Sequence, residues 1–270
     1  MSLLLALMHS LLVIIFGILI AMPKSKILIK NVSEIERYDV LSSESSLNIA
    51  PYEQVLKDYW HEVIADAQSA GTEIWDGQYY RLENIDEIQR SSLQLKLSTI
   101  SYSTTRSLMK LSQQQNLASC YFPYHINTGA LISTSDDFFV FGQKTTKSGT
   151  YYLDLIGGGL QKDELDVQQA IDIKNNILKE AFEEANITSS MIDWVNLNSL
   201  ILTNTMSVVI LFNIKLNVDK GLLLKSFEDR VENELSGLQF FDHESVNELS
   251  HKENRLSYLS LIPKLVKNFS

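Results

Sequence analysis

The feature that most constrains the fold of this chain is a run of three glycines, at 157–159, between a strand pattern and a long helix pattern. The strand pattern covers Tyr151–Ile156 and leads directly into the glycines. Hydrophobic spacing then predicts a helix over Asp166–Ala185, with Asp166 as N-cap and Gln169 three residues later, as in a capping box. Because glycine has no Cβ, the backbone of such a turn can approach a ligand or a metal closely.

The predicted helix carries three glutamates on one side. Glu180, Glu183 and Glu184 are three and four residues apart, so they share a face, which we expect to lie opposite the apolar stripe. Like charges at this spacing repel each other, and bound divalent cations would reverse the sign of that interaction. A solvated acidic face is the common alternative, but the adjacent glycine turn favours a site for a metal and a diphosphate. The predicted apolar stripe consists of Val167, Ala170, Ile171, Leu178, Ala181, Phe182 and Ala185.

Composition argues against several other classes of function. The 270 residues carry a formal net charge of −10, which does not suit an extended nucleic-acid interface with its clustered lysines and arginines. The single cysteine, Cys120, excludes an intramolecular disulfide framework and a zinc site built from several thiolates. The five histidines are scattered, and the sequence has no Walker motif, dinucleotide fingerprint or nucleophile elbow.

The N-terminal segment predicts a membrane anchor. Residues 1–23 carry no charge, and Leu3–Met22, at about 1.5 Å per residue, is long enough to cross a hydrocarbon layer of about 30 Å. The first basic residues, Lys24, Lys26 and Lys30, follow this segment, so the positive-inside rule places the rest of the chain in the cytoplasm. The alternative is a true start at Met22, which would give a cytoplasmic protein.

Hydrophobic patterning divides the rest of the chain into two regions. Residues 24–125 are expected to form a small α+β region, with Trp60 and Trp75 in its core. Residues 126–270 mix strands and helices without regular alternation, which is typical of a layered α+β domain with a mixed sheet. The predicted elements are helices over Pro51–Ala70 and Thr104–Gln115, strands over Gln78–Leu82, Leu93–Tyr102, Tyr151–Ile156, Met206–Leu216 and Leu238–Asp242, and a hairpin joining Ala130–Ser133 to Phe138–Gly142.

The glycine turn and the acidic helix resemble the motif of the Nudix hydrolases. That motif is Gly, five residues, Glu, seven residues, then Arg-Glu-aliphatic-x-Glu-Glu-x-Gly-aliphatic. Gly158 and Glu164 match the first spacing, and 179–187 (KEAFEEANI) matches the second block with two substitutions. The resemblance covers residues 126–270 and implies an α/β/α sandwich with a mixed sheet there, preceded by the smaller α+β region and the hydrophobic N-terminal helix.

The sequence departs from this motif in three ways. Fourteen residues, not seven, separate Glu164 from Lys179; seven extra helical residues would leave the acidic face within about 20° of its place, and a loop would not affect it. Lys179 replaces arginine, which keeps the charge and loses the bidentate fork. Asn186 replaces glycine at the expected end of the helix, a mild change because asparagine tolerates a left-handed conformation.

The resemblance implies roles for the glutamates and the residues around them. Glu180, Glu183 and Glu184 would bind the metal, and Glu180 would also orient or deprotonate the attacking water. Lys179 would complete the catalytic set by orienting neighbouring carboxylates. The implied substrate-contacting residues are Gly157, Gly158, Gly159 and Glu164.

Two further sets of metal ligands follow from the resemblance. A backbone carbonyl of Gly158 or its neighbour would join the ligands, with Glu164 as a supporting acid. Many family members add a glutamate from a later loop, for which Glu232 and Glu234 are the candidates here. A solvated loop is the alternative for these two residues.

The implied activity is hydrolysis of a diphosphate bond in a nucleoside diphosphate derivative, dependent on Mg²⁺ with Mn²⁺ as an alternative. Residues 75–82 (WDGQYYRL) and the following LQLKLSTISY are similar to the N-terminal region of Nudix enzymes that split UDP-sugars, so a UDP-sugar is the first candidate substrate. ADP-sugars and dinucleotides are the others. The rival hypotheses are an inactive Nudix-fold module that binds a nucleotide or a protein at a membrane, favoured by Lys179 and the insertion, and a purely structural membrane-tethered domain. The sequence leaves the oligomeric state open.

Overall fold

The computed structural model describes residues 24–30, 38–69, 71, 73–88, 93–115, 117–146 and 149–269. The predicted membrane anchor at 1–23 lies outside the described residues. Within the described part of the chain, no helix combines the length and the apolar character that a bilayer span requires.

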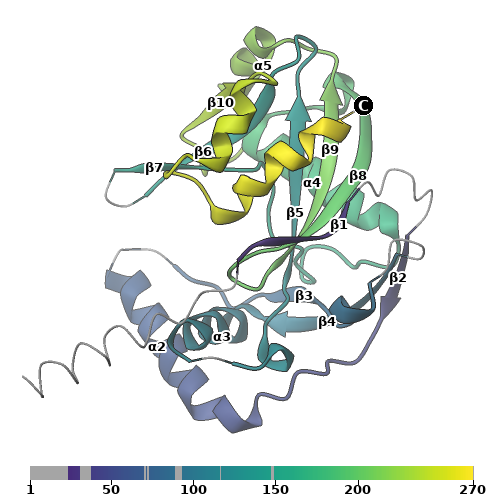
Figure 1. Cartoon of the computed structure of the whole chain (residues 1–270). Coiled ribbons are helices and arrows are strands. Elements are labelled where there is room, and N and C mark those ends of the chain that lie inside the picture. Colours follow the sequence, from purple (N-terminus) through teal and green to yellow (C-terminus); the bar gives the residue numbers. More distant parts are fainter. Residues whose placement is uncertain are drawn as a thin grey trace, which may run out of the picture.

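A seven-stranded mixed sheet forms the centre of the molecule (Figure 1). Its order is β1-β8-β9-β5-β6-β10, and β7 pairs with the free part of β6. Strands β5 and β9 run parallel, and the other pairs are antiparallel. The predicted hairpin, the predicted strands of this region and the mixed-sheet α+β class are thereby confirmed. The strands are β1 (Lys26–Lys30), β5 (Ile126–Ser133), β6 (Phe139–Thr145), β7 (Tyr151–Asp154), β8 (Ile192–Leu202), β9 (Val208–Leu216) and β10 (Gly237–Phe241).

Strand β9 shows how the sheet separates two cores. Successive strand residues point to opposite faces, so Val208 and Ile210 join one apolar cluster and Val209 and Leu211 join the other. The first cluster packs under helix α4 (Ala170–Ala185) and α5 (Lys220–Phe227). The second packs under three C-terminal 3₁₀-helices, so the expected three layers are present with 3₁₀ turns in one of them. These are η6 (Ser245–Ser250), η7 (Ser257–Lys264) and η8 (Val266–Asn268).

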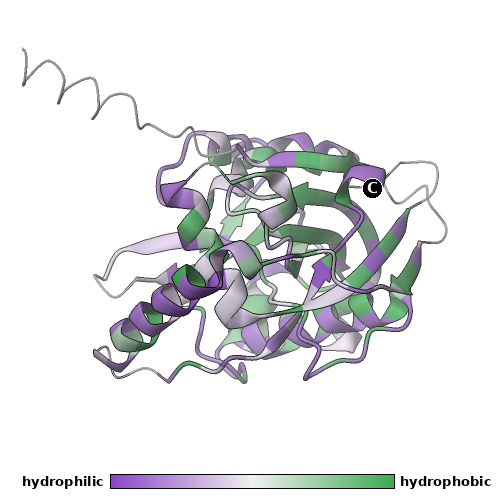
Figure 2. Ribbon diagram, turned by 90° about the horizontal axis from the view of Figure 1, so that it is seen from below, coloured by the Kyte–Doolittle hydropathy of each residue, from purple (hydrophilic) through white to green (hydrophobic). Residues whose placement is uncertain are grey.

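The N-terminal region adds a three-stranded sheet and two helices. Its strand order is β2-β4-β3, and a small core including Leu108 and Leu111 packs between the helices and β4. Figure 2, seen from below, shows polar residues along the outward faces of the helices and apolar residues on the strands. The elements are β2 (Asp39–Ser42), α2 (Glu53–Ser69), β3 (Gln78–Leu82), β4 (Gln94–Ser101) and α3 (Tyr102–Gln114), with short 3₁₀ turns η2 (Ala50–Tyr52), η3 (Ile85–Glu87), η4 (Ser119–Tyr121) and η5 (Ser189–Met191).

The prediction that Trp60 and Trp75 are core aromatics is wrong for Trp75, whose surface is 62% exposed. Its ring instead covers the backbone of Gly77, where a Cβ would clash with it. Trp60 is half-buried and meets the Tyr102 ring edge to face at 6.1 Å. A flat ring over a glycine can bury one face while the other stays in solvent, and hydrophobic spacing does not reveal this.

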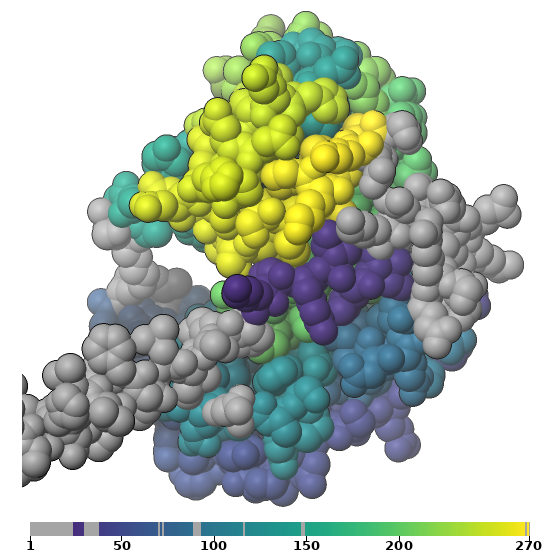
Figure 3. Space-filling model, in the orientation of Figure 1, coloured from purple at the N-terminus to yellow at the C-terminus, as the bar shows by residue number. Residues whose placement is uncertain are grey.

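Backbone hydrogen bonds join the two regions closely. Strand β1 pairs with β8 and so adds an N-terminal strand to the edge of the large sheet. Figure 3 shows β1 in dark purple against the yellow C-terminal segment, where Ser25 Oγ lies 3.1 Å from Ser257 Oγ. Strand β3 runs beside the segment that follows the glycines: Tyr80 N–H donates to the Leu160 carbonyl at 2.9 Å. The division at residue 125 stays a prediction.

A buried ion pair in the small sheet joins Arg81 to Glu83, whose side chains are both buried. Glu83 also accepts hydrogen bonds from the Ser46 backbone N–H at 3.1 Å, the Ser46 hydroxyl at 2.6 Å and the Ser98 hydroxyl. Burial by itself raises the pKa of Glu83, but hydrogen bonds from Arg81, Ser46 and Ser98 outweigh it and lower the pKa to about 2.

Glu83→Gln is expected to lower the free energy of unfolding by about 2 kcal/mol at pH 7, because it leaves a buried guanidinium without its counter-charge. The folded-state pKa lies below the ordinary value of 4.5, so the stabilisation is present above pH 4.5 and is lost as the pH falls toward 2. Urea unfolding at pH 7 and pH 3 should therefore show a smaller difference between the two proteins at pH 3. Equal urea midpoints at pH 7 would contradict this.

Candidate functional site

The glycine turn is held along strand β5 by backbone hydrogen bonds. Thr128 N–H donates to the Gly158 carbonyl, and Ala130 N–H to the Ile156 carbonyl, both at 2.9 Å. One lone pair of the Gly158 carbonyl, a predicted metal ligand, is therefore already used. Gly157 has φ +149°, and a Cβ there would run into the Thr128 carbonyl oxygen. Glycine is thus required at 157 by both backbone conformation and space.

Helix α4 begins at Ala170, so the predicted N-cap at Asp166 is wrong by three residues. The N-cap is Gln169, in a capping box with Asp172, whose carboxylate accepts the N–H groups of Gln168 and Gln169 at 2.8 Å each. This capping box, and not a cap at Asp166, fixes the first residue of the helix. The helix ends at Asn186, whose φ of 51° is the left-handed conformation expected there.

The three glutamates do not lie opposite the apolar stripe, and that expectation is wrong. Glu184 is 1% exposed and faces the interior, whereas Phe182 and Ile171, predicted in the stripe, are 41% and 50% exposed. The buried side of the helix includes Glu184 because polar partners meet it there. Its carboxylate accepts the Gly157 N–H at 2.8 Å and lies 3.2 Å from Lys144 Nζ.

Glu180 lies directly against the glycine turn. Its carboxylate fills the space that a Cβ at Gly158 would occupy. Two of the three helix carboxylates, those of Glu180 and Glu184, thus lie at the turn. The third, Glu183, is partly exposed and pairs with Lys179 at 3.3 Å.

The insertion does not separate Glu164 from Lys179. Lys179 Nζ lies 2.6 Å from Glu164 Oε2, although fourteen residues separate the two in sequence. Residues 165–169 form a loop and residues 170–178 form the first part of α4. The longer spacer is therefore part loop and part helix. Lys179 therefore bridges two of the predicted site carboxylates, Glu164 and Glu183.

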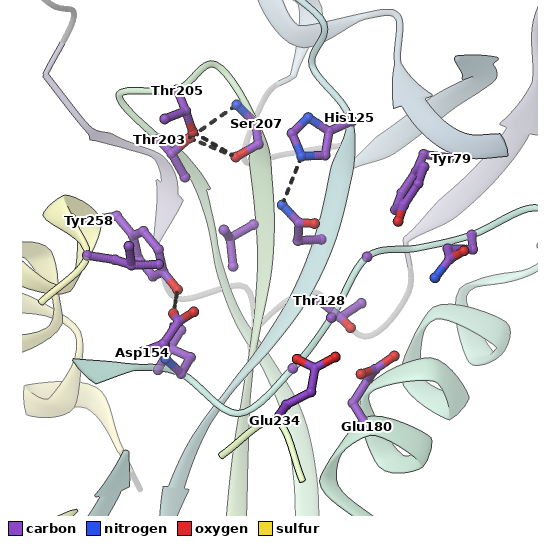
Figure 4. A pocket seen from close by; sticks show the side chains of 18 of the residues that line it. Tyr79, His125, Thr128, Asp154, Glu180, Thr203, Thr205, Ser207, Glu234 and Tyr258 are labelled. Carbon is purple, nitrogen blue, oxygen red and sulfur yellow. Dashed lines mark hydrogen bonds between the residues drawn. The ribbon is translucent and has the colours of Figure 1, made fainter. Parts of the chain in front are cut away.

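The loop that carries Glu232 and Glu234, between α5 and β10, also lies at the acidic helix and Lys144. The Glu232 backbone N–H donates to the Glu183 carbonyl at 2.9 Å, and Glu234 Oε2 lies 3.3 Å from Lys144 Nζ. Figure 4 shows Glu234 and Glu180 on the same side of the cavity. Both candidates from the sequence, Glu232 and Glu234, line this cavity.

Lys144, on strand β6, is a charged residue of the site that the sequence does not predict. Its ammonium lies between Glu184 and Glu234. Burial alone would lower the pKa of Lys144, but Glu184, Asp154 and Glu234 raise it overall, so the side chain stays charged. No local sequence pattern marks Lys144 as a site residue. It reaches the glycine turn because β6 pairs with β7, the strand that leads into the turn.

The electrostatics of the helix carboxylates show a shortage of positive charge. Burial raises the pKa of Glu180 to about 7, Lys179 acts against this, and Glu184, Glu183 and Glu232 raise it further. Burial also raises the pKa of Glu184, against the effects of Lys144 and the Gly157 N–H. A bound divalent cation would relieve this repulsion.

The donors fit a divalent cation in chemistry. Carboxylate oxygens are the ligands that Mg²⁺ and Mn²⁺ prefer, and the missing Cβ at Gly158 lets the Glu180 carboxylate meet the turn. As the described side chains stand, no three of the His, Cys, Asp and Glu residues converge closely enough to hold a metal ion. Lys144 and Lys179 hold Glu184, Glu234 and Glu183 in ion pairs instead.

The carboxylates form one end of a cavity of about 540 Å³. A volume of this size suits a small organic ligand rather than a metal ion alone. Its remaining wall is aromatic and mostly uncharged at one side and hydroxyl-rich at another, where Figure 4 shows Thr203, Thr205 and Ser207. The arrangement can therefore hold a cation and an anionic group at the acidic end, with neutral parts of the same ligand beyond.

Two alanine substitutions separate the roles of neighbouring glycines. Gly157→Ala is expected to lower the free energy of unfolding by at least about 2 kcal/mol, because it strains a glycine-only conformation and meets backbone. Gly158→Ala meets only the mobile end of Glu180 and is expected to stay within about 1 kcal/mol of the parent. Urea unfolding of both variants checks this, and equal losses would contradict the assignment.

Comparison with known proteins gives a match among solved structures only. No protein-family model and no curated protein matches the chain. It is similar to the protein DR0079 from Deinococcus radiodurans (14% identity, TM-score 0.35, 53% of this chain and 80% of that one). It is also similar to a Nudix hydrolase from Nitrosomonas europaea (11%, 0.28, 45% and 74%) and to a bifunctional NMN adenylyltransferase/ADP ribose pyrophosphatase from Francisella tularensis (17%, 0.35, 60% and 45%). Scores and identities this low fix neither an activity nor a substrate.

Proposed function

We propose that this chain is a Nudix-type pyrophosphohydrolase that cleaves a diphosphate bond in a nucleoside diphosphate derivative, with Mg²⁺ or Mn²⁺ as cofactor. The single observation that carries the proposal is the contact between the glycine turn and the acidic helix. Glu180 fills the space over Gly158, and Glu184 accepts the Gly157 N–H at 2.8 Å. The degenerate motif at 157–187 supports the same assignment.

The proposed roles follow from charge and position. Glu180, Glu183, Glu184 and Glu234, with a backbone carbonyl of the turn, would hold the cation. When bound, the cation would neutralise charge on the diphosphate. Glu180, whose carboxylate lies against the turn, would orient the attacking water or take its proton, as the resemblance implies. Lys179 keeps Glu183 and Glu164 in place through its ion pairs.

A substrate panel tests the activity. The purified chain is incubated with UDP-sugars, ADP-sugars, dinucleoside polyphosphates and ADP-ribose in MgCl₂ or MnCl₂, and release of nucleoside monophosphate is measured. UDP-sugars are the first candidates because residues 75–82 resemble the branch that splits them. Glu180→Gln protein, purified in parallel, controls for contaminating hydrolases. No release from any substrate with either metal would contradict the proposal.

The rival function is a nucleotide-binding module without turnover. It is favoured by the ion pairs that Lys144 forms with Glu184 and Glu234, two of the carboxylates proposed as cation ligands. Calorimetric nucleotide binding together with an inactive substrate panel would support this alternative. Binding of neither cations nor nucleotides would leave a structural, membrane-tethered domain.

The membrane location is proposed from residues 1–23 alone, with the body facing the cytoplasm. Fractionation of cells that express the full-length chain tests it. A wholly soluble product that begins at Met22 would exclude the anchor.

A further inference from the structure

The cavity continues past the carboxylates onto a wall of different character. This wall is built largely from the N-terminal region, because β3 and α3 lie beside the glycine turn and the start of β5. It is aromatic and mostly uncharged, whereas the adjoining end of the cavity is acidic. We call it the Tyr79 wall. Its residues are Tyr79, Arg106, Met109, His125 and Asn127, with Gln161 at its edge.

Tyr79 is held in a fixed position by the last glycine of the turn. A Cβ at Gly159 would clash with the Tyr79 ring, so the ring packs directly on that backbone. The ring also meets His125 edge to face at 6.3 Å and Tyr102 at 5.7 Å. Gly158 receives Glu180 and Gly159 receives Tyr79, so the aromatic surface begins one residue from the acidic end.

The polar groups of this wall are uncharged or unpaired. His125 Nδ1 is buried without a hydrogen-bond partner, and Nε2 lies 3.4 Å from the Asn127 side-chain nitrogen. Burial, together with Arg106, lowers the pKa of His125 to about 4, so the ring is neutral at physiological pH. Buried polar atoms in proteins are nearly always paired, so the unpaired Nδ1 is unusual for a residue that lines a cavity.

Arg106 adds a cation that forms no ion pair with the described residues. Its side chain is exposed, and no carboxylate of the described residues lies within ion-pair distance of its guanidinium. The guanidinium instead lies over the Tyr102 ring at 5.9 Å. A guanidinium next to aromatic rings can stack on a further planar group.

The hydroxyl-rich end of the cavity differs from the Tyr79 wall, because its polar groups are small hydroxyls that are already hydrogen-bonded. Thr203, Thr205 and Ser207 exchange hydrogen bonds there, and the Tyr258 hydroxyl donates to Asp154. Figure 4 shows these groups across the cavity from Tyr79. This end offers many small hydroxyls and suits a polyol, whereas the Tyr79 wall suits a flat ring with polar edges.

We propose that the Tyr79 wall binds the nucleobase of the substrate, as a planar heterocycle stacked on Tyr79 and Arg106 with its edge toward Asn127 and Gln161. This assignment rests on the proposed function and adds to it which end of the cavity takes the base. The N-terminal region then determines the choice of base, and the acidic end binds the diphosphate.

Calorimetry on the full chain in MgCl₂ tests this with UMP, AMP and the base-free probe ribose 5-phosphate. The wild type is expected to bind at least one nucleotide about tenfold or more tightly than ribose 5-phosphate, because base stacking on an aromatic side chain contributes about that much. Tyr79→Leu is expected to reduce the preference to about threefold or less, and Tyr79→Phe, which keeps the ring, to preserve it. Thr205→Val, at the other end of the cavity, is the matched control and should preserve it.

Equal binding of nucleotide and ribose 5-phosphate by the wild type, or an undiminished preference in Tyr79→Leu, would overturn the proposal. If Tyr79→Leu does not fold, Arg106→Gln decides, because Arg106 is exposed and its loss should still weaken nucleotide binding by about threefold. A preference lost in Tyr79→Leu without turnover of any substrate would mean that the base site is right and the hydrolase assignment wrong. If the wild type hydrolyses a substrate but Tyr79→Leu keeps the full preference for nucleotide over ribose 5-phosphate, the hydrolase assignment would be right and the base site wrong.

Discussion

Glu180→Gln is expected to lower kcat by at least about 100-fold, the usual minimum for loss of a general base, while leaving the protein at least as stable. The variant keeps the size of the side chain over Gly158 and removes a charge that Glu183, Glu184 and Glu232 repel. Loss of turnover without loss of stability separates a catalytic role from a structural one. Gly158→Ala, which displaces the same carboxylate, should reproduce the loss.

The pH dependence of stability provides a second readout for Glu180. Its folded-state pKa of about 7 lies above the ordinary 4.5, so the unfolded state releases this proton more readily. The stability that protonated Glu180 contributes is therefore fully present below pH 4.5 and is lost as the pH rises through about 7. In metal-free buffer, Glu180→Gln should exceed the wild type in Tm at pH 8 and match it near pH 4. Glu228→Gln, an exposed glutamate outside the cavity, is the control. A Tm below wild type at pH 8 would contradict the repulsion.

Lys144→Met is expected to destabilise the metal-free protein by about 3 kcal/mol, because it leaves the buried Glu184 carboxylate without its cation. Methionine is close in length to lysine, so the change removes mainly the charge. The divalent cation should then compensate: MgCl₂ or MnCl₂ is expected to raise the Tm of Lys144→Met more than that of the wild type, because the lysine no longer competes for Glu184 and Glu234.

Differential scanning calorimetry with EDTA and with each metal measures both effects. Lys57→Met is the matched control, because Lys57 pairs with Glu53 on an exposed helix face and should change stability by about 0.5 kcal/mol or less. An unchanged Tm of Lys144→Met in EDTA would show that Lys144 does not neutralise the cluster. An equal response of both proteins to metal would show that it does not compete.

The local features of the site follow from the sequence, because local rules produce them. The turn at 157–159 needs glycine, Asn186 ends the helix in a left-handed conformation, and the spacing of Glu180 and Glu184 brings both to the turn. The apolar run that becomes β9 is unmistakable because both faces of its sheet are covered. These features depend on neighbours within a few residues, or on burial alone.

The features that could not be predicted depend on distant partners. An amphipathic pattern assigns a glutamate to solvent, and only the Gly157 N–H and Lys144 make burial of Glu184 acceptable. The sequence does not predict strand β8, because polar residues interrupt its apolar pattern. One of them, Asn198, is buried there and donates a 2.7 Å hydrogen bond to Asn213 on β9. Tyr79 belongs to a strand some eighty residues before the glycine on which it packs.

The shared sheet has a practical consequence for anyone who shortens this protein. An expression fragment that starts after residue 125 would lose β1 and leave the backbone edge of β8 bare. Such an edge recruits strands from other molecules, so the fragment should tend to self-associate. It would also lack the ring that covers Gly159. Aggregation of that fragment, or its lack of activity in an assay, would therefore result from the truncation and would say nothing about the chemistry of the intact chain.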